Sequence, residues 1–281
     1  MKKIERIGIV IKPHAPAIQD LLVQLTAFIE EKGIAVLLEE AAAEMLQREG
    51  AVRREEIPQQ VDMAVVLGGD GTLLSIAHLA AHAGIPVLGG NLGSLGFLTE
   101  VPREELFLTI NAFLAGNRDI VSPRQLLEVK TSEKTYLCLN DMVLHKGALA
   151  RMIHWDIWID EKRIATSRAD GLIISTPTGS TAYSLSAGGP IVHPYLPGIV
   201  MTPICPHTFT FRPMIISSRV RIKIRLNTDE EEVFLTLDGQ RGGKMHKGDI
   251  VEVRSSELKF ELISSPKRNY FDLLQEKLGW G

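Results

Sequence analysis

Apolar residues in the first third of the chain follow two alternating patterns. Short apolar runs, typical of buried strands, cover residues 7–11, 34–38, 63–67 and 86–89. Between them, residues 17–32 and 72–82 repeat apolar positions at spacings of three and four, which predicts helices. This alternation predicts a Rossmann-like α/β domain with an open, mostly parallel sheet. A ligand of such a sheet is expected at the carboxyl ends of its strands.

After a helix expected over residues 104–114, the pattern changes to strand after strand. The expected strands cover residues 126–131, 135–144, 152–160, 172–176, 199–204, 220–226, 233–237 and 250–253. We therefore expect a fold of the class α/β plus all-β, with a Rossmann-like domain over residues 1–120 and a β-sandwich over residues 121–265. Residues 266–281 are expected to form a short amphipathic helix or tail that packs back on the protein.

The composition is that of an ordinary globular protein. Of the 281 residues, 45% are hydrophobic and 23% are charged, and the net charge is −3. Because the chain has no basic block or stripe, we expect no nucleic-acid and no membrane partner. No apolar stretch approaches the roughly 20 residues that span a bilayer, and the first residues read as a strand rather than a signal peptide. Cys138 and Cys205 lie in apolar neighbourhoods, so we expect two buried free thiols in a cytoplasmic protein.

Residues 68–72, Gly-Gly-Asp-Gly-Thr, form a glycine turn between an expected strand and an expected helix. Glycines let a phosphate approach the backbone, and the start of a helix attracts anions. Asp70 is costly at such a position unless it holds a metal ion or takes a proton from a nucleophile. The alternative is a tight turn with a helix-capping aspartate, because short glycine motifs are weak evidence by themselves.

A second motif, residues 176–190, combines hydroxyl residues, glycine-rich turns and Tyr183. Backbone N–H groups and small hydroxyls can bind sugar and phosphate oxygens, and a tyrosine ring can stack on a base. The alternative is a surface loop rich in serine and threonine. Prolines and glycines such as Pro177 and Gly189 argue against that alternative, because they restrict the path of the chain.

Four segments together resemble the NAD kinases. In order along the chain they are residues 68–72, 93–99, 139–141 and 176–183. The resemblance spans about residues 5–265. Diacylglycerol and sphingosine kinases share the glycine turn, and the turn is related to that of the phosphofructokinases. The Thr-Pro-Thr-Gly-Ser-Thr-Ala-Tyr segment is much more specific.

The resemblance implies transfer of the γ-phosphoryl group of ATP to the 2′-hydroxyl of the adenosine ribose of NAD, which gives NADP. It implies a site in the cleft between the two domains and a homodimer or homotetramer. Mg²⁺ or another divalent cation would accompany ATP, and no protein side chain is assigned as its ligand. An alcohol is a poor nucleophile at neutral pH, so a carboxylate that accepts its proton assists the reaction.

Individual site residues follow from the resemblance, position by position. Asp70 matches the catalytic base, and Gly71 lets the chain pass close to the ribose. Asn140 and Asp141 match an Asn-Glu pair that holds the dinucleotide, although this chain has the shorter Asp. The remaining positions that match dinucleotide contacts are Arg151, Arg168, Asp170, Thr181, Ala182, Tyr183, Ser184, Ser186 and Gln240.

Two other functions remain open at this stage. A lipid or sugar kinase would use the same glycine turn but has no need for residues 176–183. A non-catalytic dinucleotide sensor would have no need for Asp70. The sequence also leaves open whether polyphosphate serves as phosphoryl donor and whether NADH serves as acceptor. His78 and His82 lie four residues apart, but the intervening residues lack the Glu of a zinc protease, so we expect no metal site there.

Overall fold

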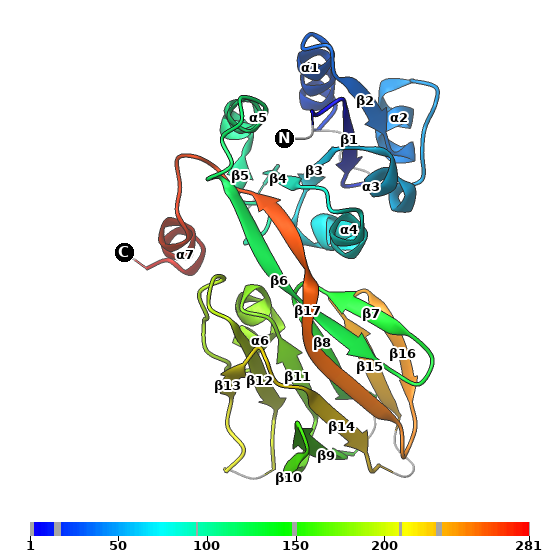
Figure 1. Ribbon diagram of the computed structural model, residues 1–281, viewed down its shortest axis with the longest axis vertical. Helices are drawn as coiled ribbons and strands as arrows, with labels where there is room; N and C mark the ends of the chain where they lie inside the picture. The colour runs from blue at the N-terminus through cyan, green and yellow to red at the C-terminus, as the bar shows by residue number, and fades with distance from the viewer. Residues whose placement is uncertain are drawn as a thin grey trace. The chain divides into compact units, whose positions relative to one another are not determined.

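The computed structural model describes residues 3–13, 18–93, 95–147, 151–207, 210–228 and 232–280. The chain divides into two compact units (Figure 1). The first unit comprises residues 1–123 and 260–281, and the second comprises residues 124–259. Of the helices within the described ranges, none is long and apolar enough to cross a membrane.

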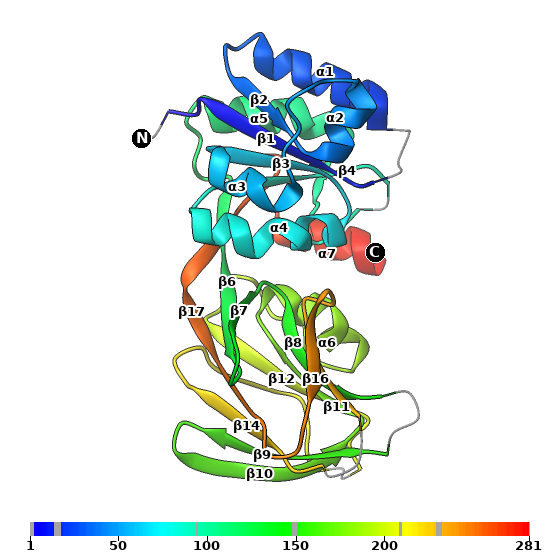
Figure 2. The ribbon, with the colours of Figure 1, turned by 90° about the vertical axis from the view of Figure 1, so that its right-hand side faces the viewer.

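The first unit contains a parallel sheet with strand order β4-β3-β1-β2. Its strands are β1 (Arg6–Ile11), β2 (Ala35–Leu38), β3 (Met63–Gly68) and β4 (Val87–Asn91), with the short β5 (Val101–Pro102) beside β4. The helices are α1 (Gln19–Glu30), α2 (Glu40–Leu46), α3 (Ile57–Gln60), α4 (Asp70–Ala83), α5 (Leu106–Leu114) and α7 (Tyr270–Leu278), with 3₁₀ turns η2 (Arg54–Glu56) and η3 (Arg103–Glu105). Helices α1 and α5 cover one face and α3 and α4 the other (Figure 2). Because both faces are covered, β3 is apolar throughout, and β1 is apolar after the exposed Arg6, rather than alternating.

The second unit is a β-sandwich. One layer is an antiparallel sheet in the order β13-β12-β11-β8-β15-β16. Its strands are β8 (Asp141–Lys146), β11 (Gly171–Ser175), β12 (Gly198–Ile204), β13 (Met214–Ser217), β15 (Val233–Leu237) and β16 (Arg241–Met245). The other layer contains β6 (Val121–Lys130), β7 (Thr135–Cys138), β9 (Ile153–Ile159), β10 (Lys162–Ala169), β14 (Ile222–Leu226) and β17 (Ile250–Ile263). Trp155 and Leu144, one from each layer, belong to the core between them.

Side chains alternate between the two faces of the β8 sheet, and this alternation places the site. Met142 and Leu144 point into the core, whereas Asp141, Val143 and His145 line a cavity on the opposite face. The segment after β11 lies beside that cavity and contains η4 (Thr178–Thr181) and α6 (Tyr183–Ser186). The outer face of this sheet therefore carries polar groups and the inner face carries the core.

The fold class expected from the sequence is confirmed, but several elements differ. The expected strand over residues 135–144 is two strands, β7 and β8, separated by Leu139 and Asn140. Strands β10, β13 and β16 and helices α2 and α3 were not expected. Residue 17, where the first helix was expected to begin, lies outside the described residues, and α1 starts at Gln19. Cys138 is buried, but the expectation of burial was wrong for Cys205, which lies exposed after β12 with φ of 45°.

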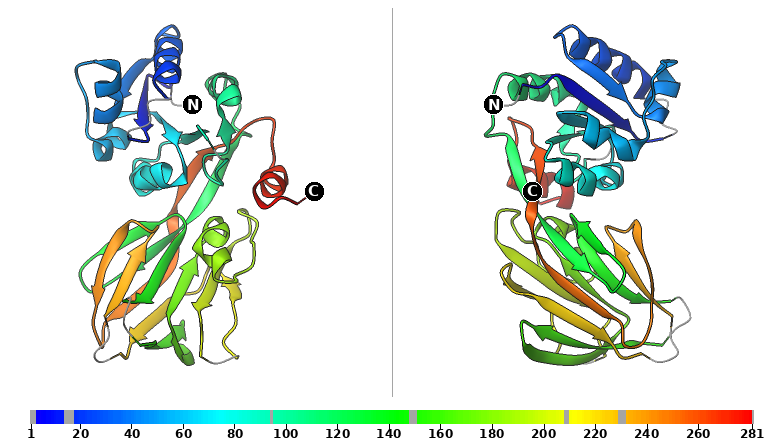
Figure 3. Two further views of the ribbon diagram at one scale, coloured as in Figure 1. Left: turned by 180° about the vertical axis from the view of Figure 1, so that it is seen from behind. Right: turned by 45° about the vertical axis from the view of Figure 1, so that its right-hand side comes forward.

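Strand β17 is the reason that the boundaries of the units differ from the expected residues 120 and 265. It was expected to end at residue 253, but it continues to Ile263 (Figure 3). Its first residues pair with β14 in the second unit, and Leu262 and Ile263 pair in parallel with β4 in the first. The chain thus returns to the first unit at residue 260. There the tail contains α7, and Arg268 forms an ion pair with Glu105 at 3.6 Å.

Candidate functional site

Asp70 begins α4, directly after β3 and the N-cap residue Gly69. Its carboxylate is held by the backbone of the loop that follows β4. Oδ1 accepts hydrogen bonds from the Leu98 N–H at 3.0 Å, the Thr99 N–H at 2.9 Å and the Thr99 hydroxyl at 3.0 Å. Oδ2 accepts from the Phe97 N–H at 2.9 Å and from no other group among the described residues. The carboxylate is therefore fixed in orientation, and Oδ2 retains the greater capacity to accept a proton.

The glycines of this turn serve two different purposes. At Gly68 a Cβ atom would come within 2.7 Å of the Thr72 hydroxyl oxygen, so close packing requires glycine there. At Gly69 and Gly71 an added Cβ would meet no atom within 4 Å among the described residues outside the neighbouring backbone, and neither residue has a positive φ. The fold itself therefore does not demand glycine at these two positions. No described residue fills the space beside them.

A cavity of about 510 Å³ opens beside this turn in the first unit. Gly68 and Gly69 line it together with Lys12, Arg103 and Arg268. Arg268 is shared with two acids, because its guanidinium also donates to Glu276 at 2.7 Å. Glu104 and Glu276 also line the cavity, so its three basic side chains outnumber the acidic ones by one. Together with the start of α4, this balance favours an anionic ligand.

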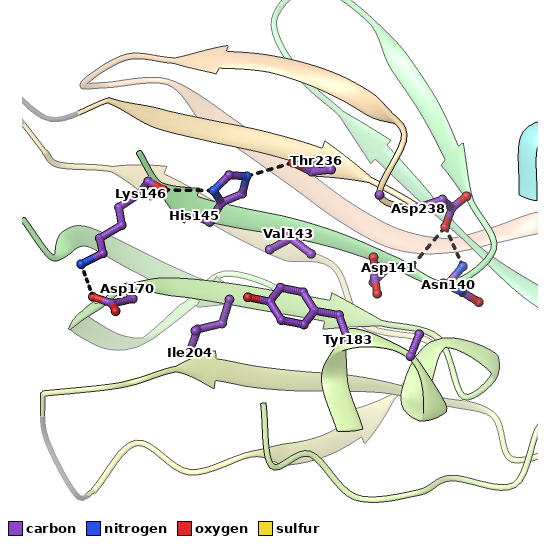
Figure 4. A pocket seen from close by; sticks show the side chains of 12 residues that line it. Asn140, Asp141, Val143, His145, Lys146, Asp170, Tyr183, Ile204, Thr236 and Asp238 are labelled. Carbon is purple, nitrogen blue, oxygen red and sulfur yellow. Dashed lines mark hydrogen bonds and ion pairs between the residues drawn. The ribbon is translucent and has the colours of Figure 1, made fainter. Parts of the chain in front are cut away.

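A second cavity, of about 610 Å³, lies on the outer face of the β8 sheet in the second unit (Figure 4). This volume is in the range of small-molecule sites. Strand β8 and the residue before it supply Asn140, Asp141, Val143, His145 and Lys146, and the end of β15 supplies Thr236, Asp238 and Gly239. The other lining residues are Asp170, Ala182, Tyr183 and Ile204.

One end of this cavity holds two carboxyl groups. Asp238 accepts hydrogen bonds from the backbone N–H groups of Leu139 at 3.0 Å, Asn140 at 2.7 Å and Asp141 at 3.3 Å. Asp141 is 4% exposed. Burial, and secondly the charge of Asp238, raise the pKa of the Asp141 carboxyl to about 7. Asp141 is therefore largely a neutral acid below neutrality.

The other end carries a positive and a polar group (Figure 4). Lys146 Nζ lies 3.0 Å from a carboxylate oxygen of Asp170. His145 Nδ1 lies 3.0 Å from the carbonyl oxygen of Lys146, and a carbonyl can only accept, so the neutral ring carries its hydrogen on Nδ1. Its Nε2 then accepts from the Thr236 hydroxyl at 3.0 Å. The ring is thus held by hydrogen bonds on both sides.

Comparison with known proteins identifies the family. Residues 7–118 match the model of the ATP-NAD kinase N-terminal domain, and residues 139–265 match that of the ATP-NAD kinase C-terminal domain. The chain belongs to the NAD kinase family. It is 46% identical to an NAD kinase of Geobacter sulfurreducens over 283 aligned residues that cover 99% of both chains. It is 41% identical to that of Solibacter usitatus, over 100% of this chain and 99% of the relative.

Two solved structures have the same fold. A yeast NADH kinase in complex with NADH superposes with a TM-score of 0.89 at 28% identity, covering 100% of this chain and 89% of the yeast chain. An NAD kinase from Archaeoglobus fulgidus in complex with ATP superposes with a TM-score of 0.78 at 25% identity, covering 98% and 100%. The chain is accordingly a phosphotransferase, an NAD kinase, and the lipid or sugar kinase alternative is not supported.

The cavity of the second unit brings together some of the residues expected to bind NAD in this NAD kinase. They are Asn140, Asp141, Asp170, Ala182 and Tyr183. Asp70 and Gly71 lie at the glycine turn of the first unit.

The other expected NAD contacts do not line this cavity. Arg151 is exposed next to residues outside the described ranges, and Arg168 is exposed on β10. The Thr181 hydroxyl donates to the Thr178 carbonyl at 3.1 Å. Ser186 and Gln240 are exposed. Ser184 is fully buried, with its hydroxyl 2.9 Å from that of Thr202, so it supports the turn from within.

Sequence reasoning missed several residues of the cavity. Val143 and His145 could have been found from Asp141, because every second residue of a strand shares a face. Asp238 lies two residues before Gln240, but only the fold shows that it binds the backbone of residues 139–141. Within the described ranges, no three His, Cys, Asp or Glu side chains are grouped to hold a metal ion.

Proposed function

We propose that Asp70 is the general base of this NAD kinase. The bond between the NAD 2′-oxygen and the γ-phosphorus forms, the bond from the γ-phosphorus to the bridging oxygen of ADP breaks, and the hydroxyl proton passes to Asp70. The observation that carries this proposal is the fixed carboxylate, with three donors on Oδ1 and one on Oδ2. A preorganised base loses no freedom when the alcohol arrives, which favours proton transfer.

We propose that the cavity of the second unit binds a nucleoside part of NAD. Tyr183, 46% exposed beside the cavity, offers a ring face for stacking. The Asn140 amide can pair with the edge of a base, and the carboxyls of Asp141 and Asp170 can bind ribose or amide groups. Thr181, Ser186 and Gln240 would contact the dinucleotide at the rim, with Ser184 as internal support.

Arginine side chains suit the phosphates of the dinucleotide. Arg168 is exposed on β10 beside His154, and its charge contributes, after burial, to lowering the pKa of that histidine. A guanidinium can bind two phosphate oxygens at once. We assign Arg168 and Arg151 to the pyrophosphate or the new 2′-phosphate.

The cavity beside the glycine turn suits the phosphates of ATP. Its N–H-rich turn and its basic residues Lys12 and Arg103 complement a polyphosphate chain. Mg²⁺ or another divalent cation would enter with ATP and neutralise phosphate charge, held by phosphate oxygens rather than by a cluster of acids.

The cellular location and the assembly of the protein are proposals that rest on the family resemblance. We propose a cytoplasmic enzyme, which agrees with free Cys138 and Cys205. We propose a homodimer or homotetramer, which size-exclusion chromatography with light scattering would distinguish from a monomer.

A coupled assay tests the proposed function. Purified protein receives NAD, ATP and Mg²⁺, and a dehydrogenase that accepts only NADP reports the product. We expect Asp70→Asn to lower turnover by roughly two to four orders of magnitude while NAD affinity changes by a few-fold at most. Asp119→Asn, an exposed acid of the same unit, is the matched control and should retain wild-type turnover.

The outcomes separate the alternatives. Near-normal turnover of Asp70→Asn would contradict the role of base. NAD binding without product in the wild type would indicate a sensor, and phosphorylation of diacylglycerol or a sugar instead of NAD would indicate the other kinase class. Replacing ATP by polyphosphate, or NAD by NADH, in the same assay defines the donor and acceptor range.

A further inference from the structure

The acid end of the second cavity has two carboxyl groups but hydrogen-bond donors for only one. Asp238 takes the three N–H groups of residues 139–141, which suits a carboxylate. The carboxyl oxygens of Asp141 receive no hydrogen bond from any described residue, although its side chain is more than nine-tenths buried and lines the cavity. A carboxyl that faces a cavity and has no protein donor among the described residues is open to a hydrogen bond with a ligand.

The charged groups around Asp141 do not favour its ionised form beside the ionised Asp238. Asp141 opens β8, which pairs with β11 on one side and β15 on the other. The anionic Asp238, which directly follows β15, lies on one side of Asp141, and the neutral Ser175 of β11 lies directly opposite. The cation of the cavity, Lys146, is already paired with Asp170 at the other end, where His145 is bonded to Thr236. Tyr183 adds a phenol from α6.

Asp141 has a shorter side chain than the Glu found at this position in many family members, and this difference keeps its carboxyl near Asp238. A glutamate would carry its carboxyl one methylene farther from the strand. The aspartate keeps its carboxyl next to the backbone of residues 139–141, where Asp238 also lies. Two ionised carboxylates in such a buried place repel each other, which favours a proton on Asp141 up to about neutrality and leaves it ionised at higher pH in the unbound protein.

We propose that Asp141 meets NAD as a neutral acid whose O–H donates a hydrogen bond to an acceptor atom of the bound nucleoside, so that NAD binding above neutrality takes up a proton. The proposal rests on the proposed binding of NAD in this cavity. A ligand that fills the cavity removes the remaining water from Asp141, which penalises the charged form further. The single proton comes from solvent, and no other bond changes.

Calorimetry of NAD binding tests this proposal. Titrations at pH 6.0 and pH 8.0 in two buffers of different ionisation enthalpy measure the protons exchanged per NAD bound. We expect uptake close to one proton at pH 8.0 and close to none at pH 6.0. The affinity should fall by up to about tenfold per pH unit above neutrality, because the unbound protein must first gain the proton.

Three variants locate the effect. Asp141→Asn keeps the shape of the side chain and a donor but cannot ionise, so uptake and the pH dependence of affinity should disappear. Asp170→Asn, at the other end of the cavity, should retain the uptake of the wild type even if its affinity changes. Asp141→Glu should show reduced uptake, because the longer arm moves the carboxyl away from Asp238.

Several results would overturn the inference. One is that the wild type takes up no proton, or releases protons, when it binds NAD at pH 8.0. Another is that Asp141→Asn takes up as many protons as the wild type. A carbon-13 NMR titration of the wild-type carboxyls gives a readout that needs no variant. One aspartate should stay protonated at pH 7 in the NAD complex, and finding every carboxyl ionised there would contradict the proposal. Failure of the proposed function differs from all of these, because it shows as no NAD binding heat and no NADP at any pH.

Discussion

Asp70 is oriented by a loop backbone rather than by a charged partner. Its carboxylate receives the N–H groups of residues 97–99 and the hydroxyl of Thr99, a residue with no exposed surface. Gly96 completes the contact, because a Cβ there would lie 2.1 Å from Asp70 Oδ1. An amide donor cannot be titrated away at physiological pH, so the orientation of the base does not depend on the charge of another side chain.

Thr99 is accordingly a positioning residue. We expect Thr99→Val, which keeps the shape but removes the hydroxyl, to lower kcat about fivefold with little change in KM for NAD, the scale of one lost hydrogen bond of about 1 kcal/mol. Thr99→Ser should restore most of kcat. Steady-state kinetics beside a thermal melt separate this effect from unfolding, and an unchanged kcat in a folded Thr99→Val protein would contradict the role.

Gly71 allows a test of why glycine occupies the turn. It lies in the first turn of α4, has an ordinary φ, and has open space where a Cβ would be. We expect Gly71→Ala to raise the free energy of unfolding by up to about 1 kcal/mol, because alanine favours helix, yet to lower kcat/KM at least tenfold because the methyl group occupies space meant for substrate. Gly96→Ala, the contrasting variant, should lose stability and activity together. Full activity in Gly71→Ala would show that substrate does not approach there.

At the scale of elements, the start of α4 is tied to β1 by a buried ion pair. Glu39, 2% exposed, accepts from the Ile11 N–H, and Arg54 donates to Glu39 Oε2 at 2.6 Å. Arg54 also donates to the Ile11 carbonyl at 2.8 Å and to the Ser75 hydroxyl at 3.3 Å, and that hydroxyl in turn donates to the Thr72 carbonyl at 2.6 Å. The network joins β1, the end of β2 and the glycine turn.

Two neighbouring arginines provide a matched pair for this network. Arg54→Met leaves the buried Glu39 charge uncompensated, and we expect it to lower the free energy of unfolding by about 3–5 kcal/mol. Arg53→Met removes only an exposed pair with Glu56, which solvent and salt screen, so we expect a much smaller loss from it. Urea unfolding of both variants measures the contrast. Equal losses in the two would mean that the Glu39–Arg54 pair does not hold the first unit together.

Periodicity predicted the elements whose apolar positions are unmistakable, and it missed those that depend on context. Strands β1 and β3 and helix α4 follow from their patterns, and so does the glycine turn that leads to Asp70. Strand β10 was missed because five of its eight residues are charged or hydroxyl-bearing and it is mostly exposed, and β16 because it contains two glycines. The sharing of β17 between the units could not be predicted, since a pairing between residues 262 and 87 leaves no local signal.

The residues of the candidate site also fall into two groups, those that the sequence predicted and those that it missed. Motifs led to Asp70, Asn140, Asp141 and Tyr183. The tertiary hydrogen bonds of Asp238 and the role of the 97–99 backbone have no signature in the sequence, because backbone amides are present at nearly every residue. Only the fold shows which amides converge on a carboxylate.

At the scale of the whole molecule, two buried acids of the second unit give opposite dependences of stability on pH. Burial raises the pKa of Asp156, but hydrogen bonds from Thr166, Asn227, Arg163 and Arg225 outweigh it and hold that pKa well below its usual range. The ionised Asp156 therefore stabilises the fold above about pH 4, and this stabilisation is lost as the pH falls further. Asp141 has a raised pKa, so its contribution is complete below about pH 4 and is lost as the pH rises to about 7.

These signs predict a maximum of stability of the second unit near pH 4, followed by a decline to about pH 7. The change from the ordinary 3.8 to about 7 at Asp141 sets an upper limit of about 4 kcal/mol on the decline. Unfolding by urea from pH 3 to pH 8, followed by the fluorescence of Trp155 and Trp158 in β9, measures it. In Asp141→Asn, the free energy of unfolding should no longer decline above pH 5, but it should still fall at acidic pH. Asp156→Asn should abolish the fall at acidic pH and lower the free energy of unfolding at every pH. A decline that persists unchanged in Asp141→Asn would place the responsible group elsewhere and remove the energetic basis for a neutral Asp141.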